Sequence, residues 1–457
     1  MTAACFADFS ARVNLALVVD HSGRAGNAFF LSLFDQHPEV VSCPWMHYVY
    51  SYATHLFDGQ DEIPAREALR VWPRQQYFAL IYAEPNPQRE ALIRKMGSDP
   101  AARIDRHAVR RAFHGVLKEK RTITRRELIL ATYFAYLTGL GRDPARARYI
   151  LLSDAISLRT ESVFGGYSGK ILDLAKADFP EAVFIHLVRD PRAGFASTNH
   201  QFINQLGNMY GVHWGNALSR LRRCLRLDFD WDSVFVFGFW LMYFRQTHAA
   251  ITRKRAQYTR QFMMVKNEDL NLDFLRTMRQ ISTHLGIAWF DDWDAGQDFT
   301  PTMLGMPWLG TGAYNNAYSP QSRLENDSPD QARRSAGPNR HVTERWKSRL
   351  APREILLIET FLWPEFGMYG YQTRHDARPG LWQWLGALLP PLRGELPAPR
   401  WVLAGWKQGF RVFLDRVFFS AVWPAYYLLA RYAFLRVVFG TKVFGDDDGT
   451  REKNSAQ

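Results

Sequence analysis

A run of apolar residues that leads through a glycine-containing loop into a helical pattern constrains this chain most. Residues 13–19 read VNLALVV, which predicts a strand buried on both faces. The loop SGRAGN (22–27) follows, and the apolar residues of AFFLSLF (28–34) then recur at helical spacing until Pro38. A buried strand that enters a helix through such a turn is a building unit of α/β folds.

Two further apolar runs repeat this strand-then-helix order. Residues 182–188 (AVFIHLV) and 262–266 (FMMVK) predict buried strands, and each precedes a helical pattern, the second of which ends at Gly286. Asp190 and Pro191 suit the first turn of the helix that follows residue 188. Residues 45–150 predict a mostly helical insertion, residues 301–340 a loop, and residues 351–366 a last helix of the core. The order predicts a parallel sheet with helices packed against it.

Charge and cysteine content narrow the classes of protein. The chain has 457 residues and a formal net charge of +12, which favours an anionic partner such as a nucleotide, an acidic glycan, a nucleic acid or an anionic membrane surface. A basic but otherwise ordinary surface is the alternative. The three cysteines lie far apart, without disulfide or metal-ligand spacing, as expected in a reducing compartment. The first twelve residues lack the pattern of a signal peptide, and we expect no N-terminal anchor.

The loop after the first strand has the chemistry of a phosphate site. Gly23 and Gly26 allow the backbone to approach an anion closely, and the helix that begins near Asn27 directs free N–H groups at the loop. Arg24 adds a permanent cation. The G-x-x-x-x-G-K-[ST] spacing of a triphosphate-binding loop is absent. The alternative is a strand-to-helix turn without a ligand.

A second candidate phosphate site follows the strand at residues 182–188. Arg189 ends that strand, and Ser197 lies eight residues further on (197 − 189) in the next helix. An arginine at the carboxyl end of a strand sits where ligands bind in open α/β sheets, and its guanidinium and the Ser197 hydroxyl can bond one anion. A surface turn formed by Arg189 and Asp190 next to a buried serine is the alternative.

Four ordered segments resemble sulfotransferases that use 3′-phosphoadenosine 5′-phosphosulfate (PAPS). HSGRAGNAFFLSLFDQHPEVV resembles their 5′-phosphosulfate loop, and FPEAVFIHLVRDPRAGFAS resembles their 3′-phosphate motif, with an arginine and a serine eight residues apart. VKNEDLNLDFLRTMRQISTHLGI and RWKSRLAPREILLIETFLWPEFGMYGY are similar to later segments of the family. The resemblance spans residues 13–371 and implies a P-loop-like three-layer α/β/α fold with a central parallel sheet.

The resemblance also implies a reaction and a set of binding residues. The reaction is in-line transfer of the sulfuryl group from PAPS, as co-substrate and without a metal, to an acceptor hydroxyl of a glycan or a lipid-linked substrate rather than a nucleic acid. Arg24 would stabilise the charge that grows on the leaving oxygen. The residues that the resemblance places around the nucleotide are Ser22, Gly23, Arg24, Ala25, Gly26, Asn27, Ala28, Arg189, Ser197, Arg345, Trp346 and Lys347.

The general base is predicted less directly. In relatives that act on glycans, a glutamate follows the His-Pro pair by about eight residues; that position is Met46 here, and His47 stands beside it. A histidine with a reference pKa near 6.5 can accept the proton of the acceptor, so His47 is the first candidate. The alternatives are Glu84, His107 and His114, or a His47 that only packs at the edge of the site. His186 lies within a buried strand and is predicted to be structural.

Three substitutions separate this chain from the usual pattern. Asp20 stands where the family often has glycine, and Asn27 and Ala28 replace threonines. Asn27 can still hydrogen-bond an oxygen, whereas Ala28 cannot. A nucleotide-binding protein, or a different nucleotide-dependent transferase, on the same scaffold is therefore the second class of function that the sequence allows.

The C-terminal part differs in kind from the rest. We expect a sulfotransferase domain over residues 1–375, an aromatic and basic amphipathic extension over 376–445, and a disordered tail over 446–457. Residues 401–445 contain thirteen aromatic and six basic residues against one acidic residue, which suits a helix that lies in a membrane interface. A helical pair packed on the catalytic domain is the alternative. The expected location is the cytoplasm, with peripheral contact to the cytoplasmic face of a membrane.

A basic cluster in the predicted insertion is a second candidate for acceptor binding. Residues 103–126 contain nine basic and two acidic residues. They could attract an anionic acceptor, or they could form a solvated helix face.

Overall fold

The computed structural model describes residues 2–20, 24–95, 104–154, 170–206, 236–308, 337–374, 379–388, 396–397 and 399–440. They form two compact units, which are described separately below: residues 1–189 with 254–344, and residues 190–253 with 345–457. The predicted boundary near residue 375 lies inside the second unit, and a separate C-terminal extension stays a prediction. The predicted tail, residues 446–457, lies outside the described residues.

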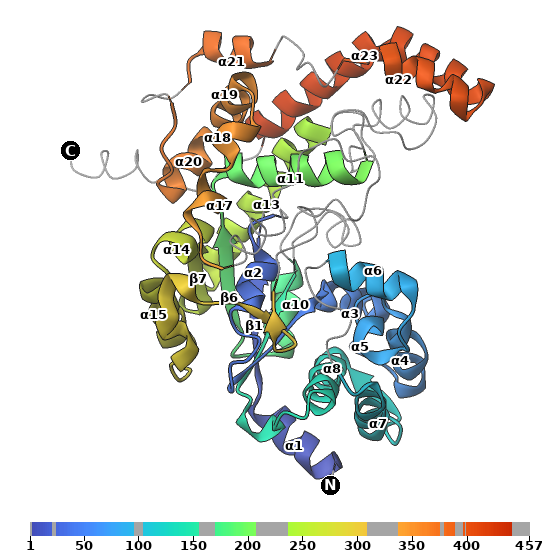
Figure 1. The fold of residues 1–457 in the computed structure, drawn as a ribbon, viewed down its shortest axis with the longest axis vertical. Coiled ribbons are helices and arrows are strands. Elements are labelled where there is room, and N and C mark those ends of the chain that lie inside the picture. The colour runs from blue at the N-terminus through green and yellow to red at the C-terminus, as the bar shows by residue number, and fades with distance from the viewer. Residues whose placement is uncertain are drawn as a thin grey trace, which may run out of the picture. The chain divides into compact units, whose positions relative to one another are not determined.

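The centre of the first unit is a parallel sheet of five strands in the order β2-β5-β1-β6-β7. Helices lie on both sides of this sheet (Figure 1), which confirms the predicted three-layer α/β/α fold. Its strands are β1 (Asn14–Val19), β2 (Val40–His47), β5 (Tyr149–Ser153), β6 (Val183–Val188) and β7 (Phe262–Lys266).

The burial of the strands explains why their sequences are continuously apolar. All six residues of β6 are buried, as are the five residues of β1 that follow Asn14. A parallel strand covered on both faces has no polar side to present to water. His186 in β6 is buried as well, which agrees with its predicted structural role.

Helices and two small ribbons complete the first unit. Within the insertion, β3 (Glu62–Pro64) and β4 (Thr122–Thr124) form an antiparallel pair. A second short pair, β8 (Thr302–Met303) and β9 (Met306–Pro307), follows α15. The helices of this unit are α1 (Thr2–Arg12), α2 (Asn27–Ser32), α3 (Val49–Phe57), α4 (Ala65–Val71), α5 (Ala79–Tyr82), α6 (Pro87–Lys95), α7 (Arg106–Leu117), α8 (Arg125–Gly139), α10 (Lys170–Asp178), α14 (Asn267–Leu272), α15 (Phe274–Leu285) and α17 (Arg340–Glu344).

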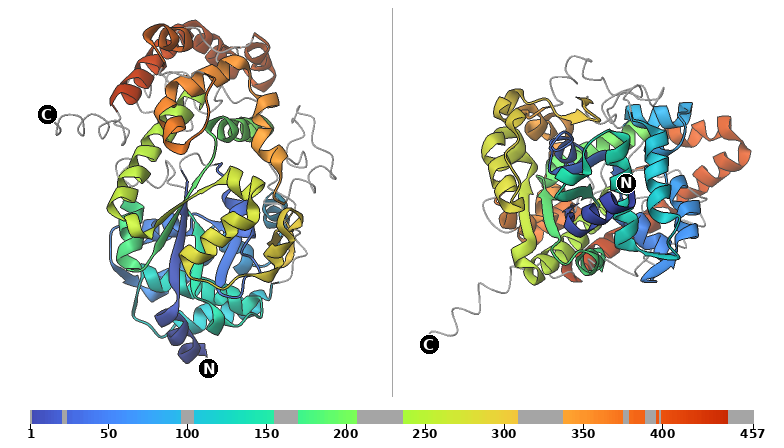
Figure 2. Two further views of the ribbon diagram at one scale, coloured as in Figure 1. Left: turned by 90° about the vertical axis from the view of Figure 1, so that its left-hand side faces the viewer. Right: turned by 90° about the horizontal axis from the view of Figure 1, so that it is seen from below.

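The described part of the second unit is helical, and α13, which joins the two units along the chain, ends in the first. In Figure 2 these helices can be recognised by their colours, from green at α11 to red at α23. They are α11 (Pro191–Leu206), α13 (Val236–Gln257), α18 (Trp346–Arg349), α19 (Pro352–Phe361), α20 (Trp363–Tyr369), α21 (Leu381–Leu388), α22 (Pro399–Ala404) and α23 (Phe410–Gly440). The start of α11 is as predicted, because the Asp190 carboxylate accepts a hydrogen bond of 2.8 Å from the Arg192 N–H.

Several predicted boundaries are wrong in detail. The helix after the glycine loop ends at Ser32 instead of Pro38. The single helices predicted after residue 266 and over residues 351–366 are each two helices, broken at Asp273 and at Leu362. Strands β2 and β5 were not predicted, and β2 extends to His47, into the region expected to be mostly helical.

Candidate active site

The sheet order brings five chain segments together at one edge. His47, Ser153, Val19, Val188 and Lys266 are the last residues of β2, β5, β1, β6 and β7, which are neighbours in that order. Because parallel strands end on the same side, the residues that follow them line one edge of the sheet. The strands that lead to the glycine loop and to Arg189 are adjacent, so the two predicted phosphate sites share this edge.

Gly26 gives the loop a shape that other residues cannot adopt without strain. Its φ of 106° is in the left-handed region, and it stands immediately before the first residue of α2. A Cβ atom built on Gly26 would lie 2.3 Å from the Asn267 amide nitrogen. Asn267, which begins α14 after β7, is buried and receives hydrogen bonds from Asn271. The loop therefore packs against the residue that follows β7, a contact that was not predicted from the sequence.

Arg189 joins the two predicted phosphate sites directly. Its Nη1 donates to the Arg24 carbonyl oxygen at 3.1 Å, and its Nη2 donates to the Val342 carbonyl oxygen at 3.2 Å. The side chain is 7% exposed, and its buried Nε has no hydrogen-bond partner among the described residues. A guanidinium has five N–H groups, so Arg189 keeps donor capacity for an anion after it has fixed the loop.

Asn27 uses its amide within the protein. Its Nδ2 donates to the Asp20 carboxylate at 2.5 Å, and its Oδ1 has no partner among the described residues. Two of the three departures from the family pattern therefore form one contact, which ties the start of α2 to the end of β1. Ala25 is buried, and Arg24 and Ala28 are half-buried at this edge. Ser22 and Gly23 lie outside the described residues.

Four of the predicted binding residues belong to the second unit. Ser197 is buried in α11, Arg345 and Trp346 are buried at the start of α18, and Lys347 is exposed. The Arg192 guanidinium lies 4.2 Å from the centroid of the Trp346 ring. Within this unit Trp346 therefore packs against the first turn of α11. That Ser197 and Arg189 bind the same anion stays a prediction.

Arg192 is itself a structural residue. It is buried between two carboxylates, with Nη2 2.6 Å from Asp190 and Nη1 2.7 Å from Glu359. Paired on both sides in this way, its charge costs little to bury and holds α11 against α19.

His47 ends β2, and a bulge sets its position. Ser42 pairs with Leu151, whereas His47 pairs with Ser153, so five steps along β2 match two steps along β5 (47 − 42 against 153 − 151). Tyr48 then adopts a left-handed φ of 57°, and its N–H donates to the Ser153 carbonyl oxygen at 3.2 Å. The backbone thus places His47 at the sheet edge; its side chain is outside the described part. Met46, at the position of the family's glutamate, is fully buried.

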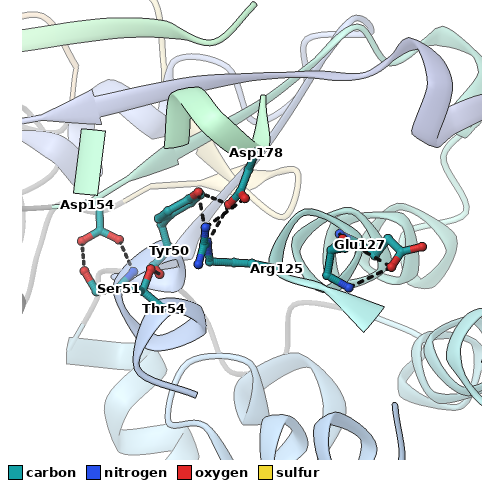
Figure 3. Close-up of polar contacts among 8 residues, drawn as sticks. Tyr50, Ser51, Thr54, Arg125, Glu127, Asp154 and Asp178 are labelled. Carbon is teal, nitrogen blue, oxygen red and sulfur yellow. Dashed lines mark hydrogen bonds and ion pairs between the residues drawn. The ribbon is translucent and has the colours of Figure 1, made fainter. Parts of the chain in front are cut away.

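Asp154 fixes the start of α3, two residues after His47. Its carboxylate accepts a hydrogen bond of 2.8 Å from the Ser51 N–H and a second one from the Ser51 hydroxyl (Figure 3). Burial raises the pKa of Asp154 to about 7, and the hydrogen bonds from Ser51 and from the Tyr50 backbone oppose this rise. Asp154 is therefore anchored to the helix and is not a free carboxylate.

A buried ion pair fixes α3 a second time. Arg125 forms two bonds with Asp178, of 2.6 Å from Nε and 2.9 Å from Nη2, and the Tyr50 hydroxyl donates to the same carboxylate (Figure 3). The three residues come from α8, α10 and α3. Both contacts of α3 lie in its first turn, so the segment that begins with His47 is held from two sides.

Two of the three alternative bases bond other side chains of the insertion. Glu84 accepts from Arg110 at 2.7 Å, an interaction that lowers the pKa of this carboxyl, and the Tyr82 hydroxyl lies 2.7 Å from His114 Nε2. His107 is exposed on α7. The described contacts thus engage Glu84 with α7 and His114 with α5.

Three arginines of the basic cluster at residues 103–126 bond other groups of the protein. Arg110 pairs with Glu84, Arg125 with Asp178, and Arg126 donates to the Ser10 carbonyl oxygen at 2.9 Å. Fewer of its basic residues are therefore available to an anionic acceptor than the sequence indicated.

Sequence reasoning missed Asp154 and Asn267. Each directly follows a strand, as Arg189 does, so the rule that located Arg189 could have found them. For Asp154 the signal was the short apolar run YILLS at residues 149–153. Within the described residues no group of three or more His, Cys, Asp or Glu side chains could hold a metal ion.

Comparison with known proteins identifies the family to which the region around Arg24, Asp154 and Arg189 belongs. A family model described as "Sulfotransferase family" matches residues 23–292. No curated protein matches the chain.

Among solved structures, the chain is similar to a sulfotransferase domain from the Synechococcus PCC 7002 olefin synthase, at 16% identity and a TM-score of 0.34, over 75% of this chain and 90% of that one. It is also similar to a sulfotransferase domain from the curacin biosynthetic pathway, at 13% identity and a TM-score of 0.38, over 79% of this chain and 99% of that one.

Proposed function

We propose, since the chain belongs to the sulfotransferase family, that it transfers the sulfuryl group of PAPS to a hydroxyl of a glycan, a glycolipid or another lipid-linked acceptor. The products are the sulfate ester and adenosine 3′,5′-bisphosphate. In the transfer the acceptor oxygen forms a bond to sulfur while the bond from sulfur to the 5′-phosphate oxygen breaks, and a base of the protein takes the hydroxyl proton.

The contact between Arg189 and the Arg24 carbonyl oxygen carries this proposal. It joins the two segments expected to bind opposite ends of one nucleotide, at the sheet edge where α/β folds bind ligands. The site fits such a ligand in two respects. Gly26 supplies the left-handed backbone at the start of α2, whose free N–H groups can receive an anion, and Arg189 retains a buried N–H without a described partner.

Each residue has a separate part in the proposed site. The backbone of residues 22–28 and the start of α2 receive the 5′-phosphosulfate, and Arg24 stabilises the charge that develops on the leaving oxygen. Arg189 and Ser197 anchor the 3′-phosphate, while Arg345, Trp346 and Lys347 cover the nucleotide. Holding donor and acceptor in register can account for about 7 kcal/mol or more of the barrier in favourable cases.

His47 is the proposed general base. The bulge in β2 brings it to the end of the sheet, and Asp154 and the Arg125–Asp178 pair fix the helix that follows it. We expect His47→Ala to lower turnover by a factor of about 100 to 10,000 and to leave the affinity for adenosine 3′,5′-bisphosphate unchanged. Turnover is measured as transfer of labelled sulfate, with His107→Ala, an exposed histidine of the insertion, as control. Full turnover by His47→Ala would remove His47 from the mechanism.

A transfer assay tests the function itself. PAPS labelled in the sulfuryl group is incubated with the protein and with either the lipid or the water-soluble fraction of cells, and labelled products are identified by mass spectrometry. A sulfated product whose formation requires Arg189 supports the proposal, and the fraction that contains it identifies the acceptor class.

A nucleotide-binding protein without transfer activity is the second candidate. The observation that favours it is the contact of Asn27 with Asp20, which occupies a polar group at the start of α2. Tight binding of adenosine 3′,5′-bisphosphate without any labelled product would favour this candidate.

A location in the cytoplasm, with contact to the cytoplasmic face of a membrane, belongs to the same proposal. Cys5 and Cys43 are free thiols, which is in line with a reducing compartment.

A further inference from the structure

Helix α23 of the second unit has an apolar face toward water. Where side chains are described, its exposed residues from 410 to 432 are apolar or aromatic except for Arg411. They recur every three or four positions, which places them on one side of the helix. We call this set the α23 stripe: Phe410, Leu414, Val417, Phe418, Ala421, Pro424, Ala425, Leu428 and Tyr432. Its six larger side chains are between 42% and 66% exposed.

The covered side of the same helix includes two of its arginines. Arg416 and Arg431 are each 8% exposed, and Phe419 and Tyr427 are buried as well. Arg416 donates to the Gln408 side chain at 2.7 Å, and the Arg431 guanidinium lies 4.7 Å from the centroid of the Tyr427 ring. A helix on the surface of a protein in water normally has the opposite arrangement. The α23 stripe therefore points to a further surface that covers it.

Helix α22 and the turn after it extend this surface. Leu403 is 64% and Trp406 is 63% exposed, and the Trp406 ring packs on Phe410 and Phe413. Gly405 lets the two helices approach closely, because a Cβ there would lie 3.0 Å from the Phe413 Cα. The segments from Pro399 to Gly440 thus form one preformed hairpin.

The charge of this hairpin decides among possible partners. Residues 399–440 contain six basic residues, Arg400, Lys407, Arg411, Arg416, Arg431 and Arg436, and one acidic residue, Asp415. Arg400, Lys407 and Arg411 are exposed around the start of the stripe. A second copy of the chain would bring the same positive charges against them, whereas an anionic lipid surface would supply phosphates beside hydrocarbon.

We propose that the α22–α23 hairpin docks the protein on an anionic membrane surface. The α23 stripe, Leu403 and Trp406 enter the boundary between headgroups and acyl chains, and the exposed arginines and lysine bind lipid phosphates. The helix lies along the surface, because its apolar stripe is exposed on one side only and its other side is covered. None of the helices in the described parts of the chain is long and apolar enough to cross a membrane.

Vesicle flotation of the full-length protein tests the proposal. The probes are vesicles of phosphatidylcholine alone and of phosphatidylcholine with about a third phosphatidylglycerol. We expect binding to the anionic vesicles that weakens as salt rises, because salt screens the attraction between the basic residues and the phosphates.

Three variants separate the stripe from the charge and from general exposure. Leu414→Glu with Phe418→Glu should weaken vesicle binding at least tenfold, since each burial of a large apolar side chain is worth about a factor of ten or more. Lys407→Glu with Arg411→Glu should remove the preference for anionic vesicles. Leu272→Glu, which changes a leucine of α14 that is 48% exposed, should bind as the unchanged protein does.

Two results would overturn the proposal. One is the absence of flotation with anionic vesicles. The other is flotation that the two stripe substitutions leave intact, as expected if they instead abolish a concentration-dependent dimer seen in ultracentrifugation. Retained melting temperature and retained binding of adenosine 3′,5′-bisphosphate show that a variant is folded, and they keep this test independent of the proposed function.

Discussion

At the scale of single residues, Gly26 combines two demands that are usually separate. Its backbone is left-handed, and its missing side chain is required by the close approach of Asn267. Alanine at this position would meet both a backbone penalty and a contact with a buried amide. The loop is thus specified by conformation and by packing together.

We predict that Gly26→Ala lowers the free energy of unfolding by about 2 kcal/mol and weakens binding of adenosine 3′,5′-bisphosphate at least tenfold. Gly59→Ala is the matched control, because Gly59 has a φ of 80° but no atom within 4 Å of its would-be Cβ. The control should cost about 1 kcal/mol and leave binding unchanged. Urea unfolding and calorimetric titration measure both effects. Equal loss of binding in the two variants would show that the contact with Asn267 has no part in the site.

Asp154 predicts a particular dependence of stability on pH. Its pKa of about 7 in the folded protein exceeds the ordinary value of 3.8, so folding favours the neutral acid. This contribution is fully present below about pH 4 and is lost as the pH rises through about 7, and it amounts to at most about 4 kcal/mol. In Asp154→Asn that dependence should disappear.

Urea unfolding between pH 4 and pH 8 measures this difference. The unfolding free energy of the unchanged protein, relative to that of Asp154→Asn, should fall as the pH rises. Asp61→Asn, which changes an exposed carboxylate before β3, is the control and should leave the profile unchanged. A constant difference between protein and Asp154→Asn across this range would show that Asp154 stays ionised in the folded state.

At the scale of elements, the start of α3 determines where His47 lies. The helix is fixed by Asp154 after β5 and by Asp178 at the end of α10, so residues from two other elements bond its first turn. The bulge in β2 and the left-handed Tyr48 leave the chain little freedom between the strand and the helix.

We predict that Asp178→Asn destabilises the protein by about 3–5 kcal/mol, because it leaves the Arg125 charge buried without a carboxylate. Glu67→Gln is the control, since its partner Arg70 is 66% exposed, and it should change stability by less than about 1 kcal/mol. Chemical unfolding followed by tryptophan fluorescence measures both. A loss of less than about 1 kcal/mol in Asp178→Asn would mean that the pair does not hold α3.

The local sequence explains which strands and helices could be predicted and which could not. Strands β1, β6 and β7 are short apolar runs next to turn residues, and such runs are read without knowledge of the rest of the fold. Strand β2 was not predicted, because Ser42, Pro44 and a bulge interrupt the apolar run that is typical of a buried strand. One apolar pattern continues from α14 into α15 and another from α19 into α20. The patterns therefore did not indicate the breaks at Asp273 and Leu362.

The candidate site divides in the same way. Arg24, Gly26 and Arg189 were predicted because each stands in a local motif that phosphate binding requires. Asp154 was missed because β5, the strand that it follows, was not predicted. The contact of Asn267 with Gly26 was missed because it depends on the strand order β2-β5-β1-β6-β7, which is a property of the assembled sheet.

At the scale of the whole molecule, the residues proposed to bind one nucleotide belong to two units. Arg24 and Arg189 belong to the first, and Ser197, Arg345, Trp346 and Lys347 to the second. The proposed function requires a ligand with phosphates at its 3′ and 5′ positions. A ligand without the 3′-phosphate reports on the group that Arg189 and Ser197 are proposed to bind.

Calorimetric titration with adenosine 3′,5′-bisphosphate, adenosine 5′-monophosphate and ATP tests this claim most directly, with Arg189→Met as the variant and Arg255→Met, at an exposed arginine, as control. The account predicts that the 3′,5′-bisphosphate binds at least about tenfold more tightly than the other two, since a hydrogen bond to a charged phosphate is worth about 1.5–3 kcal/mol. It also predicts that only Arg189→Met removes this advantage. Equal or tighter binding of ATP, or an advantage that survives in Arg189→Met, would contradict it.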